Sequence, residues 1–241
     1  MKKVATIEII ERVDSILDRM VAISNKEEVV TMDELDALYK EYDEIKAEYD
    51  LFDQVFEENG MQGVRNVRGK VLVPALYKDY AEVYIYSKHG QPKPIVACDF
   101  NDKYALVTSD GKGTPICGFE YDMIKFMFGS CALYKCWKRV GEKYLTGVLD
   151  CEGNVIVPCE MDEVYGFCNN FAVVEKDGKF GAVTTNSFYV EPLYDEIEER
   201  EGYLTACKDG NWGYVSSKGE FIDENDEDRM DEEELLCLFE Y

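Results

Sequence analysis

The stretch that decides the fold is KFGAVTTNSFYVEPLYDEI, residues 179–197. Gly181-Ala182-Val183 is typical of a short strand, and Tyr189-Val190-Glu191 predicts a second strand that returns beside it. Pro192 is expected to end that pairing, because proline has no backbone donor. Tyr194-Asp195-Glu196-Ile197 then turns the chain into a third strand. The stretch therefore predicts an antiparallel meander of short strands.

The same pattern recurs along the chain. In three copies a proline follows the glycine by 11 residues: Gly63 and Pro74, Gly147 and Pro158, Gly181 and Pro192. A more degenerate copy begins at Tyr104-Ala105, and a fifth begins at Trp212-Gly213. Aligned positions are separated by 42, 42, 34 and 32 residues, as in a repeat array. Asp177-Gly178 and Asp209-Gly210 predict hairpin turns that lead from one copy to the next.

These residues resemble the WG (KWG) repeat of bacterial proteins over about residues 60–223. The resemblance is carried by the Pro-x-Tyr-Asp-Glu-Ile pattern, the Asp-Gly hairpins, Lys179-Phe180-Gly181 and Asn211-Trp212-Gly213. Trp212 keeps the tryptophan of the Trp-Gly pair, whereas Phe180 and Tyr104 replace it in other copies. The resemblance implies an all-β repeat domain and no shared catalytic residues.

The N-terminal residues predict a helical hairpin. A first apolar stripe steps by three and four residues and is followed by a break at residues 24–26. Thr31 and Glu34 are typical of a capping box that begins a second helix. Its stripe continues to Phe56, and Asn59-Gly60 is expected to end it. We expect the stripes to pack within the chain, with a homodimer through these helices as the alternative. The stripes comprise Ile9, Val13, Ile16, Met20 and Ile23, then Leu35, Leu38, Tyr42, Ile45, Tyr49, Phe52 and Phe56.

The sequence thus predicts an α+β protein in three parts. Residues 1–58 form an antiparallel helical hairpin, and residues 59–223 form a WG-type β-repeat domain. We expect about five degenerate repeats in an open curved or barrel-like array. Residues 224–241 form an acidic tail with a short helix built on Leu235, Leu236, Leu238 and Phe239.

The formal net charge of −24 constrains the choice of partners. It argues against direct binding to nucleic acid and makes a basic protein partner electrostatically easier. The acids gather in two appendages: residues 31–60 hold 11 acids and 2 bases, and residues 220–241 hold 11 acids and one base. Mimicry of a nucleic acid, which would inhibit a nucleic-acid-binding protein, is therefore an alternative function.

Cysteine usage and hydropathy favour a cytoplasmic protein. The 9 cysteines are an odd number, and neither a secretory segment nor a run of 18 apolar residues is present. Free thiols, no membrane association and no structural zinc are expected, because the chain has no C-x2-C pair and its one histidine is His89. We predict no bound metal or cofactor.

The acidic tail also fits a more specific hypothesis, which is a calcium-binding loop. Asp223, Asn225, Glu227, Asp231 and Glu234 match positions 1, 3, 5, 9 and 12 of an EF-hand loop. Asp228 stands where that loop requires glycine, so a solvated acidic linker is the preferred interpretation.

No catalytic residue is predicted. Phosphate-binding glycine motifs and a nucleophile elbow are absent, and His89 is expected to lie exposed in a turn. We predict a non-enzymatic protein-interaction module that uses its repeat surface, with an enzyme of unrecognised type as the second alternative. Tyr84-Ile85-Tyr86 and Tyr134-Lys135-Cys136-Trp137 are candidate anchors for a partner, although core packing is the commoner role of such residues.

Overall fold

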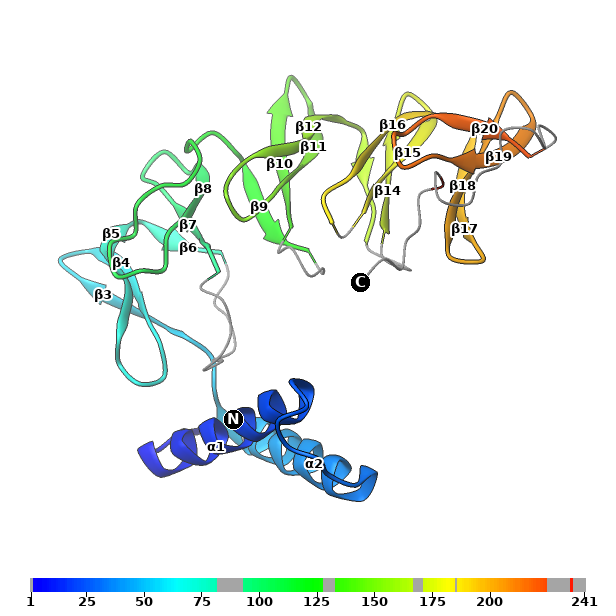
Figure 1. Ribbon diagram of the computed structural model, residues 1–241. Coiled ribbons are helices and arrows are strands. Elements are labelled where there is room, and N and C mark those ends of the chain that lie inside the picture. The colour runs from blue at the N-terminus through cyan, green and yellow to red at the C-terminus, as the bar shows by residue number, and fades with distance from the viewer. Residues whose placement is uncertain are drawn as a thin grey trace. The chain divides into compact units, whose positions relative to one another are not determined.

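The computed structural model describes residues 2–81, 93–127, 133–166, 171–184, 186–224 and 235. Two N-terminal helices precede a series of antiparallel sheets, which confirms the α+β class (Figure 1). Within these ranges the sheets are open and none closes into a barrel. The chain divides into two compact units. The first comprises Met1–Asn101 and Val107–Pro115, and the second comprises Asp102–Leu106 and Ile116–Tyr241.

The helical hairpin begins the first unit. Helix α1 spans Ile7–Ser24 and helix α2 spans Met32–Glu48. The predicted capping box is confirmed, because Thr31 Oγ1 accepts from the Glu34 amide while Glu34 accepts from the Thr31 amide at 2.8 Å. Val13 and Ile16 share a buried cluster with Leu38 and Ile45, so the helical parts of the two stripes pack against each other within the chain. A homodimer through these helices stays a prediction.

The predicted extension of the second helix to Phe56 is wrong. Helix α2 ends at Glu48, and residues Tyr49–Asp50 form strand β2, which pairs in parallel with β1, Lys3–Val4. Strand β3, Gln54–Glu58, then pairs with β4, Met61–Arg65. Asn59 and Gly60 have φ of 53° and 75°, as a two-residue hairpin turn requires. They therefore form a hairpin rather than a helix cap, and the β-repeats begin before residue 59.

The first unit continues with short sheets. Strand β5, Val71–Tyr77, completes a three-stranded sheet of order β3-β4-β5. Strand β6, Asp79–Tyr80, pairs with β7, Ile95–Cys98. Strand β8, Tyr104–Val107, carries the chain across the boundary between the units. This is the degenerate copy: β8 joins β6 and β7 in a three-stranded sheet, and in addition it makes isolated bridges to Tyr121 and Pro115.

Three four-stranded sheets follow one another in the second unit (Figure 1). Each is an antiparallel meander, as predicted. The first sheet contains β9 (Met123–Phe126), β10 (Tyr134–Val140), β11 (Lys143–Leu149) and β12 (Val155–Met161). The second contains β13 (Glu163–Val164), β14 (Phe171–Lys176), β15 (Lys179–Thr184) and β16 (Tyr189–Tyr194), and the third contains β17 (Glu196–Arg200), β18 (Tyr203–Lys208), β19 (Asn211–Val215) and β20 (Phe221–Asp223).

The repeat prolines lie inside strands, which corrects the expectation that they end the pairing. Pro158 lies within β12, where Thr146 pairs with Met161 but Val148 pairs with Val157. Three residues of β12 therefore oppose the single residue Gly147, and the strand bulges past the proline without needing its missing donor. The same register shift occurs in β5 around Pro74 and in β16 around Pro192.

The repeat aspartates fasten each hairpin to the preceding turn. Asp195 accepts from the Asp209 amide at 2.8 Å and pairs with Lys179. Asp122 likewise accepts from the Arg139 amide at 2.7 Å and pairs with Lys103 at 2.6 Å. These contacts lower the pKa of Asp195 and of Asp122, with the lysine hydrogen bond as the first cause. The lysine and aspartate of the repeat pattern thus act together within one copy.

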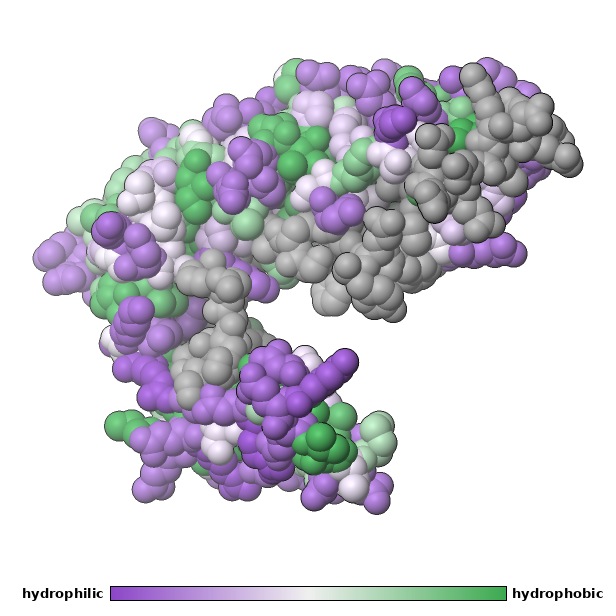
Figure 2. All heavy atoms as spheres, viewed as in Figure 1, coloured by the Kyte–Doolittle hydropathy of each residue, from purple (hydrophilic) through white to green (hydrophobic). Residues whose placement is uncertain are grey.

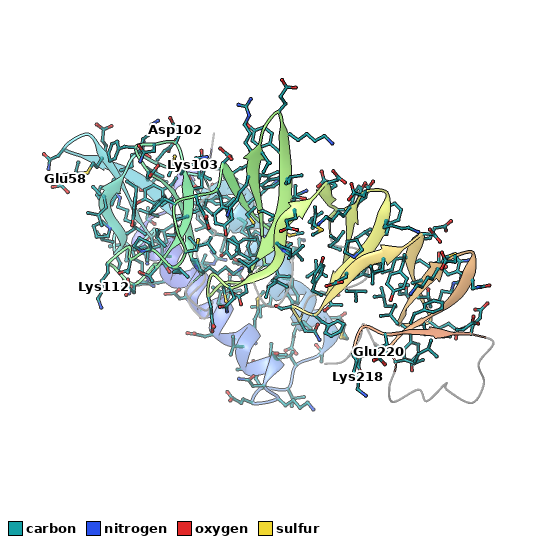
Figure 3. All side chains as sticks on the ribbon, turned by 90° about the horizontal axis from the view of Figure 1, so that it is seen from above. Glu58, Asp102, Lys103, Lys112, Lys218 and Glu220 are labelled. Atoms are coloured by element: carbon teal, nitrogen blue, oxygen red, sulfur yellow. The ribbon has the colours of Figure 1, made fainter. Side chains whose placement is uncertain are left out.

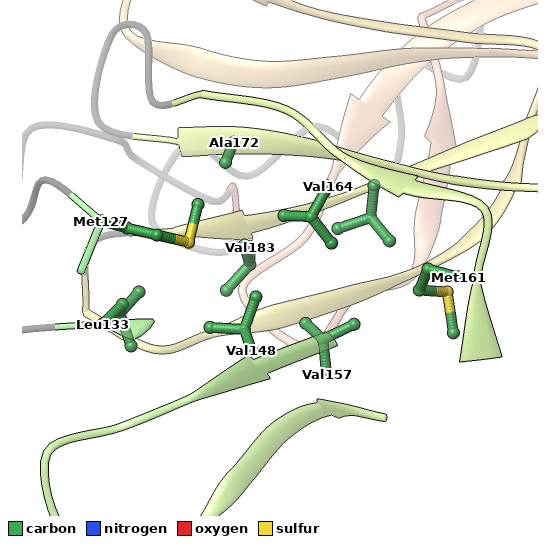
Figure 4. Packing of buried hydrophobic residues seen from close by; sticks show 9 residues of the cluster. Met127, Leu133, Val148, Val157, Met161, Val164, Ala172 and Val183 are labelled. Carbon is green, nitrogen blue, oxygen red and sulfur yellow. The ribbon is translucent and has the colours of Figure 1, made fainter. Parts of the chain in front are cut away.

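Consecutive sheets of the second unit share a buried core. Val148 and Val157 of the first sheet pack with Val174 and Val183 of the second sheet (Figure 4). Hairpin tips carry charged side chains outward, as Glu58 and Lys218 show (Figure 3). Buried apolar side chains thus lie between consecutive sheets, and charged side chains lie at the hairpin tips. A binding site is therefore expected at the ends of the spaces between sheets.

Candidate binding pocket between two sheets

A pocket of about 350 Å³ lies between the first and second sheets of the second unit. Strands β9 and β10 form one wall, and the end of β13 with the two residues after it forms the other. A pocket near the lower end of ~300–1,000 Å³ suits a side chain or a small group rather than a large cofactor. The lining residues are Lys125, Phe126, Met127, Lys135, Trp137, Val164, Tyr165 and Gly166.

Two lysines lie side by side on adjacent strands of one wall. Lys125 on β9 is the direct cross-strand partner of Lys135 on β10. Directly opposed side chains in an antiparallel pair lie on the same face of the sheet, about 5 Å apart at Cβ, where like charges are destabilising. Lys125 is exposed and makes no ion pair in the described part of the chain. The wall therefore carries one ammonium group that no described carboxylate neutralises.

Lys135 is held by the neighbouring sheet. Its side chain, 16% exposed, pairs with Glu163 and also donates to the Val164 carbonyl. The same ammonium lies 4.9 Å from the centre of the Trp137 ring. Because Lys135 and Trp137 are two residues apart on one strand, they share a face, and their contact fixes the indole at the wall.

Aromatic and apolar groups complete the pocket. The Tyr165 side chain is 46% exposed, and its hydroxyl donates to Glu175 at 2.5 Å. This hydrogen bond raises the pKa of Tyr165. Met127 and Val164 belong to the core cluster between the sheets, so the base of the pocket is continuous with packed interior (Figure 4). The pocket thus joins positive charge and aromatic rings to an apolar base.

The sequence pattern had indicated part of this wall. Lys135 and Trp137 line the pocket, whereas Tyr134 and Cys136 of the same segment point to the opposite face and are buried. Sequence reasoning missed Lys125 and Tyr165. The signal for Lys125 is the strand register, which sets it against Lys135, and that register is not written in either strand alone.

Other residues singled out by the sequence lie outside the described residues. These are His89, Tyr84-Ile85-Tyr86 and most of the acidic tail, including Asn225, Glu227, Asp231 and Glu234. Asp223 ends strand β20, and Leu235 forms an isolated bridge with Ser216. The calcium-loop hypothesis and the C-terminal helix are therefore left as predictions.

No group of three or more His, Cys, Asp or Glu residues in the described part of the chain is placed to hold a metal ion. Neither described helix has the length and apolar character that crossing a membrane requires.

Comparison with known proteins gives one family. The model of the WG containing repeat matches residues 147–180. The match begins at Gly147 in β11 and ends at Phe180 in β15. One family repeat therefore starts at the glycine opposite the bulge in the first sheet and ends within the Lys-Phe-Gly segment of the second sheet. A search of curated proteins finds no match. The match to this segment, and the same register shift in β5 and β16, support a WG-containing β-repeat protein.

Proposed function

We propose that this protein is a non-enzymatic interaction module and that the pocket receives a carboxylate-bearing segment of a protein partner. The observation that carries the proposal is the Lys125–Lys135 pair beside Trp137. Opposed lysines cost stability unless an anion lies between them. Glu163 neutralises Lys135 alone, which leaves Lys125 for a carboxylate from another molecule.

The aromatic groups supply the second half of the binding. Trp137 is half-buried and Tyr165 is exposed. Both line the pocket, together with Met127 and Val164 at its base. Aromatic residues that become fully desolvated when a partner binds contribute a large share of interface binding energy. The expected ligand is therefore an acidic side chain or a terminal carboxylate next to an apolar side chain.

Exposed acidic residues lie on helix α2 of the first unit, whereas the pocket belongs to the second unit. Asp33, Glu34 and Asp36 at the start of α2 are exposed, and hydrophilic side chains dominate the face of the helices seen in Figure 2. Such charge favours approach of a partner that is basic overall. A basic partner with one acidic anchor satisfies both features. We place the interaction in the cytoplasm, since the described cysteines are free thiols.

Nucleic-acid mimicry remains the alternative, favoured by the exposed acids of α2. Several acids of the hairpin are already paired, with Arg12 to Glu41 and Arg19 to Glu28 each within 2.7 Å. Paired acids make a weaker copy of a phosphate backbone than free ones. We therefore favour the pocket as the binding element.

Peptide selection tests the proposal. A library of random peptides displayed on phage is selected against the wild-type chain and against Lys125→Glu and Trp137→Ala variants. We expect wild type to enrich peptides with Asp, Glu or a free C-terminus beside an apolar residue. Both variants should lose this enrichment by at least tenfold, because each removes one half of the pocket.

The matched control is Lys143→Glu, which makes the same charge change on the same sheet at an exposed position outside the pocket. It should select the same peptides as wild type. Binding of a selected peptide is followed by the fluorescence of Trp137 in a Trp212→Phe background. Equal enrichment by wild type and by both pocket variants would refute the pocket as the binding element.

A further inference from the structure

Two cysteine thiols of the first four-stranded sheet lie in contact. Cys136 on β10 and Cys159 on β12 have their Sγ atoms 3.2 Å apart. These strands are not neighbours, because β11 lies between them. For these two side chains to touch, β12 must come closer to β10 than regular pairing through β11 would allow.

Gly147 and the proline bulge permit that approach. Gly147 is the cross-strand partner of Cys136, and the three bulged residues of β12, which include Cys159, oppose it. A Cβ added at Gly147 would lie 2.9 Å from Cys159 Sγ and 2.6 Å from the Val157 carbonyl oxygen. The repeat glycine therefore leaves the space through which the Cys159 thiol reaches Cys136.

The two thiols differ in exposure. Cys136 is 1% exposed, whereas Cys159 is half-buried. The hydrogen bond between them lowers the pKa of Cys159 and raises the pKa of Cys136, and nearby Lys138 also lowers the pKa of Cys159. The outer thiol is thus suited to attack, and the inner thiol to resolve, in thiol–disulfide exchange.

We propose that Cys136 and Cys159 form a thiol–disulfide modification site driven by a low-molecular-weight disulfide such as oxidised glutathione. The Cys159 thiolate attacks one glutathione sulfur, which forms a mixed disulfide and releases one glutathione thiolate. Cys136 gives its proton to solvent, attacks Cys159 Sγ and displaces the second glutathione. Overall, two protein thiols are oxidised to one disulfide and one oxidised glutathione is reduced to two thiols.

The bond would staple β10 to β12 across β11. It closes a loop between positions 23 residues apart and fixes the bulge over Gly147. Restricting the unfolded chain in this way is expected to raise the Tm of the second unit by roughly 5–10 °C. Reduction reverses the change, so the site would tie the stability of this repeat to the thiol–disulfide balance.

Peptide mapping of the full chain tests the proposal. The protein is incubated with oxidised glutathione, remaining thiols are alkylated, and trypsin with a glutamyl endoprotease cuts the chain. These enzymes isolate Cys136 within residues 136–138 and Cys159 within residues 153–160, each without another cysteine. We expect the two peptides joined, with the loss of two hydrogens, and their separation after reduction.

Variants separate this pair from the other thiols. Cys159→Ser should abolish the joined peptide and the rise in Tm, and Cys207→Ser, a buried cysteine on β18, should change neither. Cys117→Ser removes a nearby half-buried thiol and should leave the pairing intact. Alkylation of both Cys136 and Cys159 in the oxidised wild type, or joining of either to another cysteine, would overturn the proposal. Either result would be visible in the wild-type peptides, whether or not the variants fold.

Discussion

At the scale of single residues, the repeat glycines are required by the space beside them. Gly147, Gly181 and Gly213 have no positive φ, so their backbone conformation is open to any residue. A Cβ at Gly181 would lie 2.3 Å from the Val190 carbonyl oxygen, and a Cβ at Gly213 would lie 2.2 Å from that of Ile222. The glycine of the Trp-Gly pair thus lets the following strand cross closely above it.

Substitution of Gly181 by alanine tests this account. The added methyl meets backbone atoms of β16, which cannot rotate away, so we expect a loss of about 1–3 kcal/mol in unfolding free energy. Urea unfolding followed by far-ultraviolet circular dichroism measures the loss. Gly118→Ala is the matched control, since a Cβ there is 3.9 Å from its nearest neighbour and φ is not positive. Equal stability of the two variants would show that the close approach of β16 does not require the glycine.

Asp53 gives a prediction for the pH dependence of stability. Burial raises the pKa of Asp53 to about 6, above its ordinary value near 3.8. The folded state therefore holds this proton more tightly than the unfolded state. Its favourable contribution is complete below about pH 4 and is lost as the pH rises from about 4 to about 6.

Asp53→Asn should then be more stable than wild type at pH 7.5, by on the order of 1 kcal/mol after discounting for partial exposure. The gain should shrink steadily as the pH falls toward about 4, where the folded wild-type carboxyl is protonated and the unfolded one is about half protonated. Urea unfolding across pH 4–8 measures the difference. Asp36→Asn, at an exposed position on α2, should parallel wild type at every pH. A constant difference between Asp53→Asn and wild type would contradict the assignment.

At the scale of elements, the periodic signals predicted strand and helix types well. The Gly-to-Pro spacing placed the strands β4, β11 and β15, and Thr31 with Glu34 placed the start of α2. The end of α2 was mispredicted because the spacing from Tyr49 to Phe56 fits a helix as well as the observed strands. Pairing with Lys3–Val4 and with Met61–Arg65 decided between them, and pairing is not a local property.

The bulged strands and the pocket also depend on strand pairing, which the local sequence does not determine. Proline at position 158 signals an interruption, but only the ladder with β11 turns that interruption into a bulge. The pocket was half predictable: an aromatic and a lysine on β10 were visible in sequence, whereas Lys125 and Tyr165 joined them through register and through stacking of consecutive sheets. Local chemistry identifies the residues, and tertiary pairing assembles them into a site.

At the scale of the whole molecule, the chain consists of two compact units, and both contain antiparallel sheets of the repeat pattern, which in the first unit follow the helical hairpin. Within the second unit each sheet shares a core with the next one, as the Val148 and Val215 clusters show. In repeat arrays stability is close to a sum of local terms and nearest-neighbour interfaces. A substitution should therefore be felt mainly in its own sheet and in the sheets next to it.

Hydrogen exchange with a matched pair of variants tests this locality. Gly181→Ala lies in the second unit and Gly63→Ala in the first, where the added Cβ would meet Phe56 at 2.5 Å and the Ala75 amide at 2.8 Å. We expect Gly181→Ala to speed amide exchange in β14–β16 and to leave β4 and β5 unchanged, and Gly63→Ala to do the reverse. Exchange measured by mass spectrometry on the full chain reports both units at once. Faster exchange in both units from either variant alone would show that the two units unfold as one, and that the stability of this repeat protein is not a sum of local terms.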